Sequence, residues 1–297
     1  MQQIVQCVPN FSEGRSQKTI DAIVAAIGEV EGIKVLDVKP DADHNRTVVT
    51  FVGHPEAVEE AAFRGIARAA ELIDMDEHRG EHPRLGAADV VPFVPIKGVT
   101  MDDCVAIAAR LGARVGSELE IPVYLYEAAA TSPDRRNLAD VRRGEYEGLK
   151  QEIAFNPARE PDFGPRRLGK AGATVIGARP PLVAFNVYLT TDDETIADKI
   201  ARAVRHASGG LRYVKALGLR VEGRAQVSMN LTDFRKTPVH RVVEMIRREA
   251  ARYGVTIAGS ELIGLIPQQA LLEAAIYYLQ LDGFSPEQVL ESHLTEG

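Results

Sequence analysis

Two histidines and one glutamate stand close together in a short segment, residues 78–87, that reads H-R-G-E-H-P-R-L-G-A. Histidine is the side chain whose ordinary pKa lies near neutrality, so a neutral imidazole on a rigid loop can accept a proton and later return it. Gly80 and Pro83 supply the turn and the rigidity of such a loop. The segment therefore indicates proton transfer centred on His82. Taken alone, these residues leave a second interpretation open, in which both histidines are solvated and have no chemical role.

The same segment matches H-x-x-E-H, a zinc-peptidase pattern that needs both histidines on one face of a helix. Gly80 would fall inside that helix and Pro83 directly follows the pattern, so we expect no helix that could bring the histidines together. The sequence offers no other credible set of metal ligands, and we therefore expect no metal cofactor. A zinc site is the alternative, and inhibition by a chelator would support it.

A second segment, residues 164–171, reads G-P-R-R-L-G-K-A and satisfies the first seven positions of a P-loop. Ala171 stands where the magnesium-binding Ser or Thr belongs. A P-loop follows a strand and opens a helix, whereas here Pro161 and Pro165 come first and we expect a strand to follow. We therefore expect no nucleoside triphosphatase. What remains is a glycine-bearing loop with three cations, which could bring N–H groups and positive charge onto carboxylates or phosphates. The alternative is an interdomain linker whose charges are solvated.

Hydrophobic residues make up 45% of the 297 residues, which is typical of a soluble globular enzyme with one large domain or two modest ones. No apolar run is long enough to cross a membrane, and the first residues lack the features of a signal peptide. Cys7 and Cys104 are the only cysteines, which favours a reducing compartment. We therefore expect a cytoplasmic protein that has no membrane partner.

Nucleic acid is not expected as a partner, because the net charge is −7 and no basic strip with interleaved aromatic residues occurs. An anionic small molecule is compatible with this charge if basic residues are concentrated locally. Two such groups exist, one within residues 135–143 and one within residues 166–170. We expect the first group to lie on a solvated surface.

Hydrophobic periodicity predicts one plan of helices and strands that occurs twice along the chain. In the first copy we predict strands at 3–8, 33–38, 47–53 and 88–95 and helices at 16–30 and 55–73. A helix that begins with a capping box of Thr100 and Asp103, and a strand at 122–126, come next. In the second copy we predict strands at 181–189, 211–219, 225–230 and 256–258 and helices at 193–207, 238–252 and 267–279.

The order β-α-β-β-α-β predicts an α/β (α+β) protein made of two ferredoxin-like subdomains. We expect the subdomains to span residues 1–180 and 181–297, with a proline- and glycine-rich linker at 156–181. Each sheet would have helices on one face only, so its other face needs cover. We therefore expect facing sheets with a ligand groove between them.

Several blocks of sequence, in order along nearly the whole chain, resemble the glutamate formimidoyltransferase family. They are V-P-N-F-S-E-G-R at 8–15, N-R-T-V at 45–48, G-E-H-P-R at 80–84, P-V-Y-L-Y at 122–126, A-F-N at 184–186, A-Q-V-S-M-N at 225–230 and G-S-E-L-I-G-L-I-P at 259–267. The resemblance implies transfer of the formimidoyl group of N-formimidoyl-L-glutamate to N5 of tetrahydrofolate, in histidine breakdown and one-carbon supply. Residues 1–180 and 181–297 would then be the N- and C-terminal subdomains of a formiminotransferase, and tetrahydrofolate would be a co-substrate.

The resemblance leaves alternatives open. Formyl transfer between glutamate and tetrahydrofolate is one, and a non-catalytic protein that binds folate or an amino acid is another. A homodimer is one assembly that the sequence allows. Animal relatives carry a fused cyclodeaminase domain, for which we expect no room before Gly297.

The resemblance also implies a set of site residues. His82 would be the catalytic acid or base, and the stretch that contacts folate would comprise Phe163, Gly164, Pro165, Arg166, Arg167, Leu168, Gly169, Lys170, Ala171 and Gly172.

An amidinium substrate is cationic, so the site needs a carboxylate. Asp41 is our first choice among Asp37, Asp41, Asp43 and Glu81. Some relatives have an acid where this chain has Lys39, which leaves that choice open.

Because both substrates carry carboxylates, we also expect cations and polar groups near the chemistry. The expected contacts are Asn45, Arg46 and Arg84, and Arg15 and His44 are further candidates.

Overall fold

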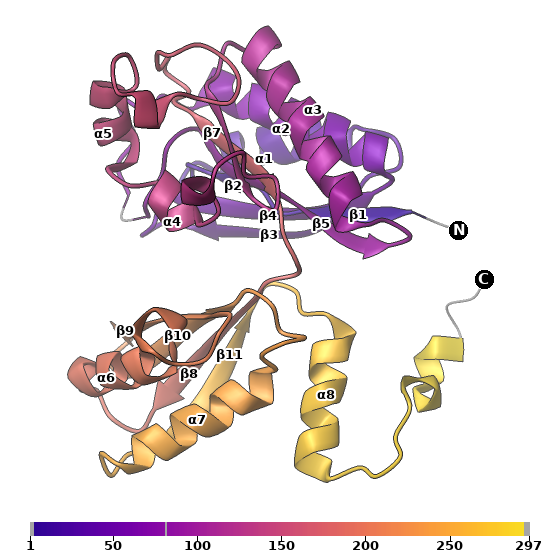
Figure 1. Cartoon of the computed structure of the whole chain (residues 1–297), viewed down its shortest axis with the longest axis vertical. Coiled ribbons are helices and arrows are strands. Elements are labelled where there is room, and N and C mark those ends of the chain that lie inside the picture. Colours follow the sequence, from indigo (N-terminus) through magenta and orange to yellow (C-terminus); the bar gives the residue numbers. More distant parts are fainter. Residues whose placement is uncertain (1–2, 81, 294–297) are drawn as a thin grey trace. The chain divides into compact units, whose positions relative to one another are not determined.

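A computed structural model of the chain describes residues 3–80 and 82–293. It divides into two compact units, Met1–Pro180 and Pro181–Gly297, which run from indigo to magenta and from orange to yellow in Figure 1. Among the helices of the described residues, none has the length and apolar character needed to span a membrane.

The first unit is built on a seven-stranded mixed sheet. Its elements are β1 (Ile4–Cys7), β2 (Asn10–Phe11), α1 (Gln17–Gly28), β3 (Lys34–Asp41), β4 (Arg46–Gly53), α2 (Pro55–Leu72), β5 (Ala88–Lys97), α3 (Met101–Glu118), β6 (Val123–Glu127), α4 (Leu138–Val141), α5 (Glu145–Glu152) and β7 (Thr174–Ala178). β3 pairs with β4, and the short strands β1 and β2 both lie between β4 and β5 in antiparallel pairings. β7 then joins β5 to β6 through parallel pairings. The predicted α/β class is confirmed, and this sheet is larger than the four-stranded one that the sequence predicted.

Local signals determine where the helices of this unit begin. The Ser16 hydroxyl accepts a hydrogen bond from the Thr19 N–H and caps α1. Thr100 and Asp103 form the predicted capping box at the start of α3. Pro55 is the first residue of α2, where its missing N–H costs no hydrogen bond. The predicted starts of these three helices are therefore confirmed to within about two residues.

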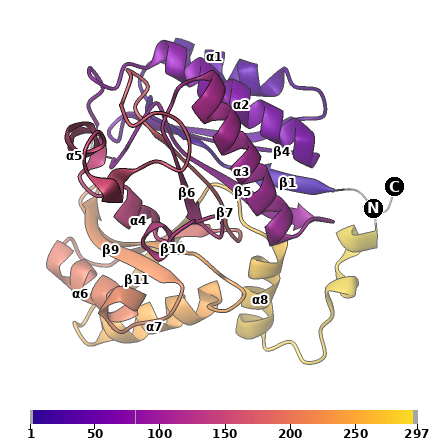
Figure 2. The same cartoon turned by 45° about the horizontal axis from the view of Figure 1, so that its top comes forward.

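Helices α1, α2 and α3 lie side by side over one face of the sheet (Figure 2). The core under them includes Phe11, Phe51 and Phe93, whose side chains are at most 1% exposed. The opposite face is covered at β5, β6 and β7 by a second cluster that includes Tyr126 and, from α5, Leu149. Part of the cover that we had expected from the other subdomain therefore comes from α4, α5 and their loops within the same unit.

The linker predicted at 156–181 is wrong, because the first compact unit extends to Pro180. Residues 174–178 form β7, a fully buried strand between β5 and β6. Proline and glycine content reports only local backbone preference, whereas β7 exists because two strands distant in sequence pair with it. The boundary between the units lies at Pro180 and Pro181.

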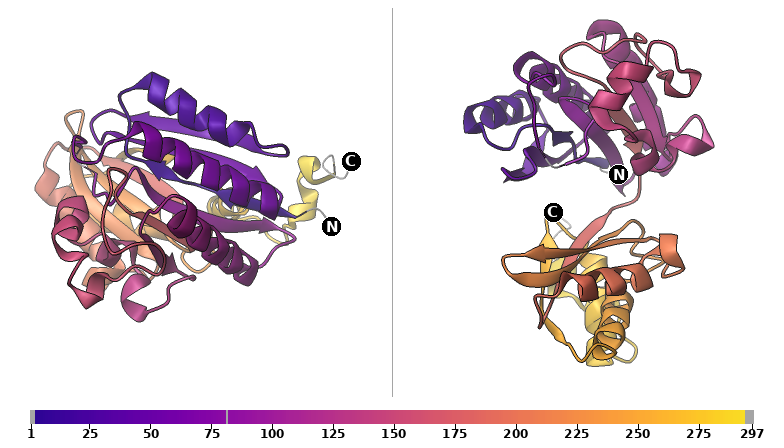
Figure 3. Two further views of the ribbon diagram at one scale, coloured as in Figure 1. Left: turned by 90° about the horizontal axis from the view of Figure 1, so that it is seen from above. Right: turned by 90° about the vertical axis from the view of Figure 1, so that its left-hand side faces the viewer.

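The second unit has a four-stranded antiparallel sheet in the order β11-β8-β10-β9. Its elements are β8 (Val183–Leu189), α6 (Glu194–Val204), β9 (Val214–Val221), β10 (Arg224–Leu231), α7 (Val239–Ala251), β11 (Ile257–Ile263) and α8 (Gln268–Leu279). Helices α6 and α7 pack on one face of this sheet (Figure 3). α8 packs on α7, where the rings of His240 and Tyr277 stack with centroids 4.4 Å apart.

We predict that Phe93→Ala lowers the free energy of unfolding by about 3–5 kcal/mol, because it opens a cavity in the core of the first unit. Ile96→Ala in the same strand is the matched control, since Ile96 is 49% exposed and its loss should cost within about 0.5 kcal/mol. Urea unfolding of both variants measures the difference. Equal losses would contradict the assignment of Phe93 to the core.

Candidate active site

Three segments of the first unit meet at Asn45, which is buried and has a positive φ of 48°. Its side-chain oxygen accepts a hydrogen bond from the Gly14 N–H at 2.9 Å, and its amide nitrogen donates to the Arg79 carbonyl at 2.9 Å. Its own carbonyl accepts a hydrogen bond from Nε2 of His78 at 3.0 Å. Asparagine tolerates this backbone conformation better than most residues. Asn45 therefore ties the loops that begin after β2, β3 and α2 into one structure.

Two glycines allow these loops to approach each other closely. A Cβ atom at Gly14 would lie 2.1 Å from the carbonyl oxygen of Asp41, and one at Gly80 would lie 2.4 Å from the carbonyl oxygen of His44. Real side chains do not reach such distances, so both positions need glycine. No helix occurs among the described residues of the segment 78–87, which excludes the geometry of the zinc-peptidase pattern. Glu81 lies outside the described residues.

His82 accepts a hydrogen bond from the guanidinium of Arg46, with 2.7 Å between Nη1 and Nε2. A guanidinium only donates, so Nε2 is the acceptor and the ring proton is on Nδ1. Burial, followed by the positive charges of Arg46 and Arg142, lowers the pKa of His82 to about 3. His82 is therefore a neutral imidazole at any physiological pH, which is the protonation state that a general base requires.

Asp41 bonds to His44. Its Oδ1 accepts the His44 backbone N–H at 2.9 Å, and its Oδ2 lies 2.7 Å from Nδ1 of the ring. Partial burial pushes the pKa of the Asp41 carboxyl upward, but the hydrogen bonds from His44 and the charge of Arg46 outweigh it and leave the pKa below its usual value. The rings of His44 and His82 meet edge to face with centroids 6.3 Å apart. The Asp41 carboxylate, which the sequence favoured, is thus bonded to the His44 ring, and it is this ring that meets His82.

Asp89 and Arg142 form a buried ion pair beside His82 that the sequence analysis did not identify as part of the site. Asp89 is the extra residue of a bulge in β5, where Asn10 and Phe11 of β2 pair with residues on either side of it. Its Oδ1 accepts the Leu85 N–H at 2.8 Å, and its Oδ2 accepts a hydrogen bond from Arg142. The solvated surface expected for residues 135–143 is therefore wrong at Arg142, and also at Arg135, whose side chain is 17% exposed and pairs with Asp162. The one sequence signal that could have indicated the ion pair with Arg142 is Asp89 itself, a single aspartate within an apolar strand.

Arg46 and Arg142 each keep a buried Nε without a hydrogen-bond acceptor among the described residues. A buried donor without a partner is costly, so a bound acceptor there would be stabilised. Burial, together with the charge of Arg142, also holds the pKa of Arg46 below its usual value. These two guanidinium groups are suited to an anionic ligand.

Unlike Arg46, Arg84 is paired with two carboxylates of α5. Its guanidinium is 7% exposed and pairs with Glu145 at 2.8 Å and Glu147 at 2.6 Å. Its Nε donates weakly to Nδ1 of His78 at 3.4 Å. These bonds fasten the His82 loop to α5. A substrate contact for Arg84 remains a prediction, and a substrate would have to compete with two carboxylates.

The segment 163–172, predicted to contact folate, is pinned by backbone hydrogen bonds to the segments on both sides of the His82 loop. The Met75 N–H donates to the Lys170 carbonyl at 2.8 Å, and the Ala87 N–H donates to the Ala171 carbonyl at 2.8 Å. A strand, β7, follows this segment, which confirms that it is not a P-loop. Arg167 and Lys170 are 73% and 80% exposed and pair with single carboxylates at 3.1 and 3.0 Å.

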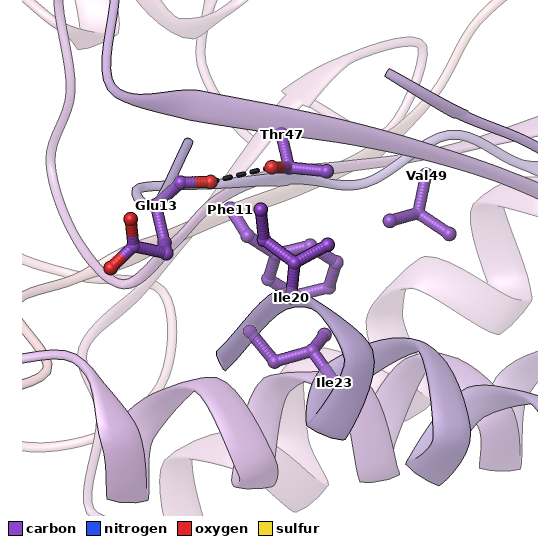
Figure 4. A pocket seen from close by; sticks show the side chains of 6 residues that line it. All are labelled: Phe11, Glu13, Ile20, Ile23, Thr47 and Val49. Atoms are coloured by element: carbon purple, nitrogen blue, oxygen red, sulfur yellow. Dashed lines mark hydrogen bonds between the residues drawn. The ribbon is translucent and has the colours of Figure 1, made fainter. Parts of the chain in front are cut away.

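A packed seam and an open hollow lie near these loops. One, lined by Phe11, Glu13, Ile20, Ile23, Thr47 and Val49, is a packed apolar seam with no room for a water molecule (Figure 4). The Thr47 hydroxyl donates to the Glu13 carbonyl across it. The other is an open hollow of about 430 Å³ lined by Arg15, Asp43, Arg79 and Gly80. Its two guanidinium groups make it the more suitable hollow for an anion.

The described residues contain no group of three or more His, Cys, Asp or Glu side chains arranged to hold a metal ion. Independence from metal stays a prediction, to be checked with chelators.

The chain belongs to the formiminotransferase domain family. The model of the N-terminal subdomain of the formiminotransferase domain matches residues 4–179, and the model of the formiminotransferase domain matches residues 184–292. The chain is 53% identical to a glutamate formimidoyltransferase of Thermoplasma acidophilum, over 97% of this chain and 96% of that protein. It is 49% identical to a glutamate formimidoyltransferase of Streptococcus pyogenes serotype M1, over 99% of both chains. It is also 47% identical to the formimidoyltransferase-cyclodeaminase of Mus musculus, over 94% of this chain and 53% of that protein.

We predict that Asn45→Ala lowers the free energy of unfolding by about 2–4 kcal/mol, because two buried hydrogen bonds are lost and alanine takes a positive φ. Glu222→Ala is the matched control, since Glu222 has a φ of 49° in an exposed turn. It should cost within about 0.5 kcal/mol, because glutamate and alanine disfavour a positive φ alike and no buried hydrogen bond is lost. Chemical denaturation measures both, and losses of equal size would show that the Asn45 side chain does not hold the loops together.

Proposed function

We propose that this protein transfers the formimidoyl group of N-formimidoyl-L-glutamate to N5 of tetrahydrofolate, which yields 5-formimidoyltetrahydrofolate and L-glutamate. One observation carries the proposal. This chain is 53% identical to a glutamate formimidoyltransferase over nearly its full length, and it holds His82 as a neutral imidazole on a braced loop. The reaction is a step of histidine breakdown and of one-carbon supply.

The chemistry requires two proton transfers. N5 of tetrahydrofolate attacks the amidinium carbon and must lose its proton, while the departing glutamate nitrogen must gain one. His82 is the general base in this proposal, because it is neutral in the free protein and stands on a loop. Holding both substrates in line supplies much of the remaining rate enhancement.

Arg46 and Arg142 bind a substrate carboxylate in this proposal. Their unpaired Nε groups favour an acceptor, and an anion there would draw Arg46 away from Nε2 of His82. Burial is the largest cause of the low pKa of His82, and the same anion offsets the two positive charges that lower it further, so the basicity of His82 rises when substrate binds. Arg15 and Arg79, at the open hollow, are suited to a further carboxylate.

The segment 163–172 contacts the folate in this proposal, with Arg166, Arg167 and Lys170 directed to its glutamate tail. The exposure of Arg167 and Lys170 supports this role, because weak surface ion pairs exchange readily for a ligand carboxylate.

Each unit contains a ferredoxin-like core in this proposal, and the two cores are the N- and C-terminal subdomains of a formiminotransferase. The strand order of the second sheet, and that of β5, β1, β4 and β3 in the first, supports it. Cys7 and Cys104 are both unpaired and buried, which supports a cytoplasmic protein.

The test is to incubate the protein with N-formimidoyl-L-glutamate and tetrahydrofolate and to follow 5-formimidoyltetrahydrofolate by mass spectrometry. A parallel reaction with N-formyl-L-glutamate distinguishes formimidoyl from formyl transfer. Saturable folate binding without product from either donor would support a binding protein instead.

His82→Ala should keep the fold and folate binding but lower kcat on the order of a hundred- to ten-thousandfold, because the base is lost. Steady-state kinetics measures this, with His206→Ala, an exposed histidine of the second unit, as the control. Unchanged turnover, or a loss of stability that accounts for the lost rate, would count against His82 as the base.

Replacing Arg166, Arg167 and Lys170 together by alanine should raise KM for tetrahydrofolate more than KM for formimidoylglutamate. The effect should grow with the length of the polyglutamate tail and shrink as salt is added, since exposed charges are screened over roughly 10 Å at 0.1 M. A triple alanine variant of the exposed cations Arg64, Arg68 and Arg110 is the control. Equal effects on both substrates at every salt concentration would refute the folate contact.

A further inference from the structure

Two imidazoles with opposite surroundings lie next to each other in the site. His82 is flanked by the cations Arg46 and Arg142, whereas His44 is held by the carboxylate of Asp41. Their ring centroids are 6.3 Å apart. Rings this close to each other can both contact one small reacting group. Pairs of titratable groups in opposed environments commonly divide acid and base tasks between them.

The geometry of His44 is defined by both oxygens of Asp41. One accepts the backbone N–H of His44 at 2.9 Å and the other lies 2.7 Å from Nδ1 of the ring. A carboxylate only accepts, so Nδ1 carries a proton and Nε2 is the nitrogen through which the ring can act on a ligand. The His44 side chain is 47% exposed, so a ligand can approach it.

We infer that His44, oriented by Asp41, is a second proton-transfer residue, which donates a proton to the departing glutamate nitrogen while His82 accepts the proton of N5. This inference rests on the proposed function and adds the general acid that a single imidazole would otherwise have to supply in a later step. Asp41 is then a positioning residue, because it acts through His44.

The protons balance in this scheme. N5 bonds to the amidinium carbon and its proton passes to His82. The imidazolium of His44 gives its Nε2 proton to the glutamate nitrogen, and the bond between that nitrogen and the amidinium carbon breaks. The proton on His82 then returns to His44, directly or through one water. That return is favourable because the surroundings of His82 hold a proton poorly.

The charges around His44 support the acid role. Asp41 carries a negative charge at neutral pH, since its pKa lies below its usual value, and it offsets the charge of an imidazolium. Arg46 faces Asp41 from β4, and His82 faces His44 from its own loop. Asp43, beside His44 in sequence, lines the open hollow together with Arg15 and Arg79. Each of the nearby cations, Arg46, Arg15 and Arg79, therefore lies near a carboxylate or near a site suited to an anionic ligand.

The test compares His44→Ala, His44→Gln and Asp41→Asn with wild-type protein in the formimidoyl transfer assay. We expect kcat of each His44 variant to fall on the order of a hundredfold, with KM for both substrates within about twofold of wild type. Free imidazole should restore part of the activity of His44→Ala, because the position is open to solvent. Asp41→Asn, which keeps an acceptor for the His44 N–H, should also lower kcat.

The pH profile of kcat separates the acid role from a structural one. A general acid acts only in its protonated form, so wild-type kcat should fall toward alkaline pH, and His44→Gln should lack this fall. His54→Ala is the matched control, since His54 is an exposed histidine that also pairs with a carboxylate, that of Glu56. It should leave kcat and the pH profile unchanged.

Two results would overturn the inference. One is a kcat for His44→Ala within about threefold of wild type. The other is a lowered kcat in His44→Gln with the alkaline fall of the wild type retained, which would mean that His44 only shapes the turn. Absence of product from wild-type protein is a separate outcome, which would defeat the proposed function together with this inference.

Discussion

The buried amide of Asn45 is the interaction on which the site depends. Its two ends join the Gly14 N–H to the Arg79 carbonyl, so loops that are far apart in sequence take up one fixed arrangement. Exchanging either end for an apolar group would leave a buried backbone group without its partner, at a cost of about 1–3 kcal/mol. The same residue turns the chain from His44 into Arg46. The placement of the His44 imidazole relative to the Arg46 guanidinium therefore depends on one left-handed backbone position.

Charge divides the site into two halves. Around His82, burial and then the cations Arg46 and Arg142 lower the pKa of the imidazole to about 3, whereas the ring of His44 is bonded to the carboxylate of Asp41. Asp89 neutralises part of the charge of Arg142 and is itself fixed by the Leu85 N–H. Buried charges persist only when they are paired in this way, so the ion pair under the loop allows a second cation to stand beside a neutral histidine.

Local patterns in the sequence predicted most helices and strands, because caps and hydrophobic periods act over a few residues. The capping box of Thr100 and the apolar face of α1 are examples. The pairing of β7 between β5 and β6, and the cover over these strands, were not predicted, since pairing and burial there depend on segments distant in sequence. The sequence marked His82 and Arg46 as site candidates through residue type and resemblance. The roles of Asn45 and Arg142 as a loop bridge and a buried ion-pair partner could not be predicted, because solvation and hydrogen-bond partners follow from the assembled fold.

The weak basicity of His82 in the free protein is an advantage to an enzyme whose substrates are anions. With Arg46 bonded to Nε2, His82 neither takes a proton from solvent nor carries charge into a buried position. A carboxylate at Arg46 and Arg142 supplies the acceptor that their Nε groups lack and weakens the field on the imidazole. The interaction energy of the ligand is then used at the reacting centre, where it raises the basicity of His82 only once a substrate is present. Selectivity for anionic substrates and activation of the base would therefore share one physical cause, the pair of cations beside the ring.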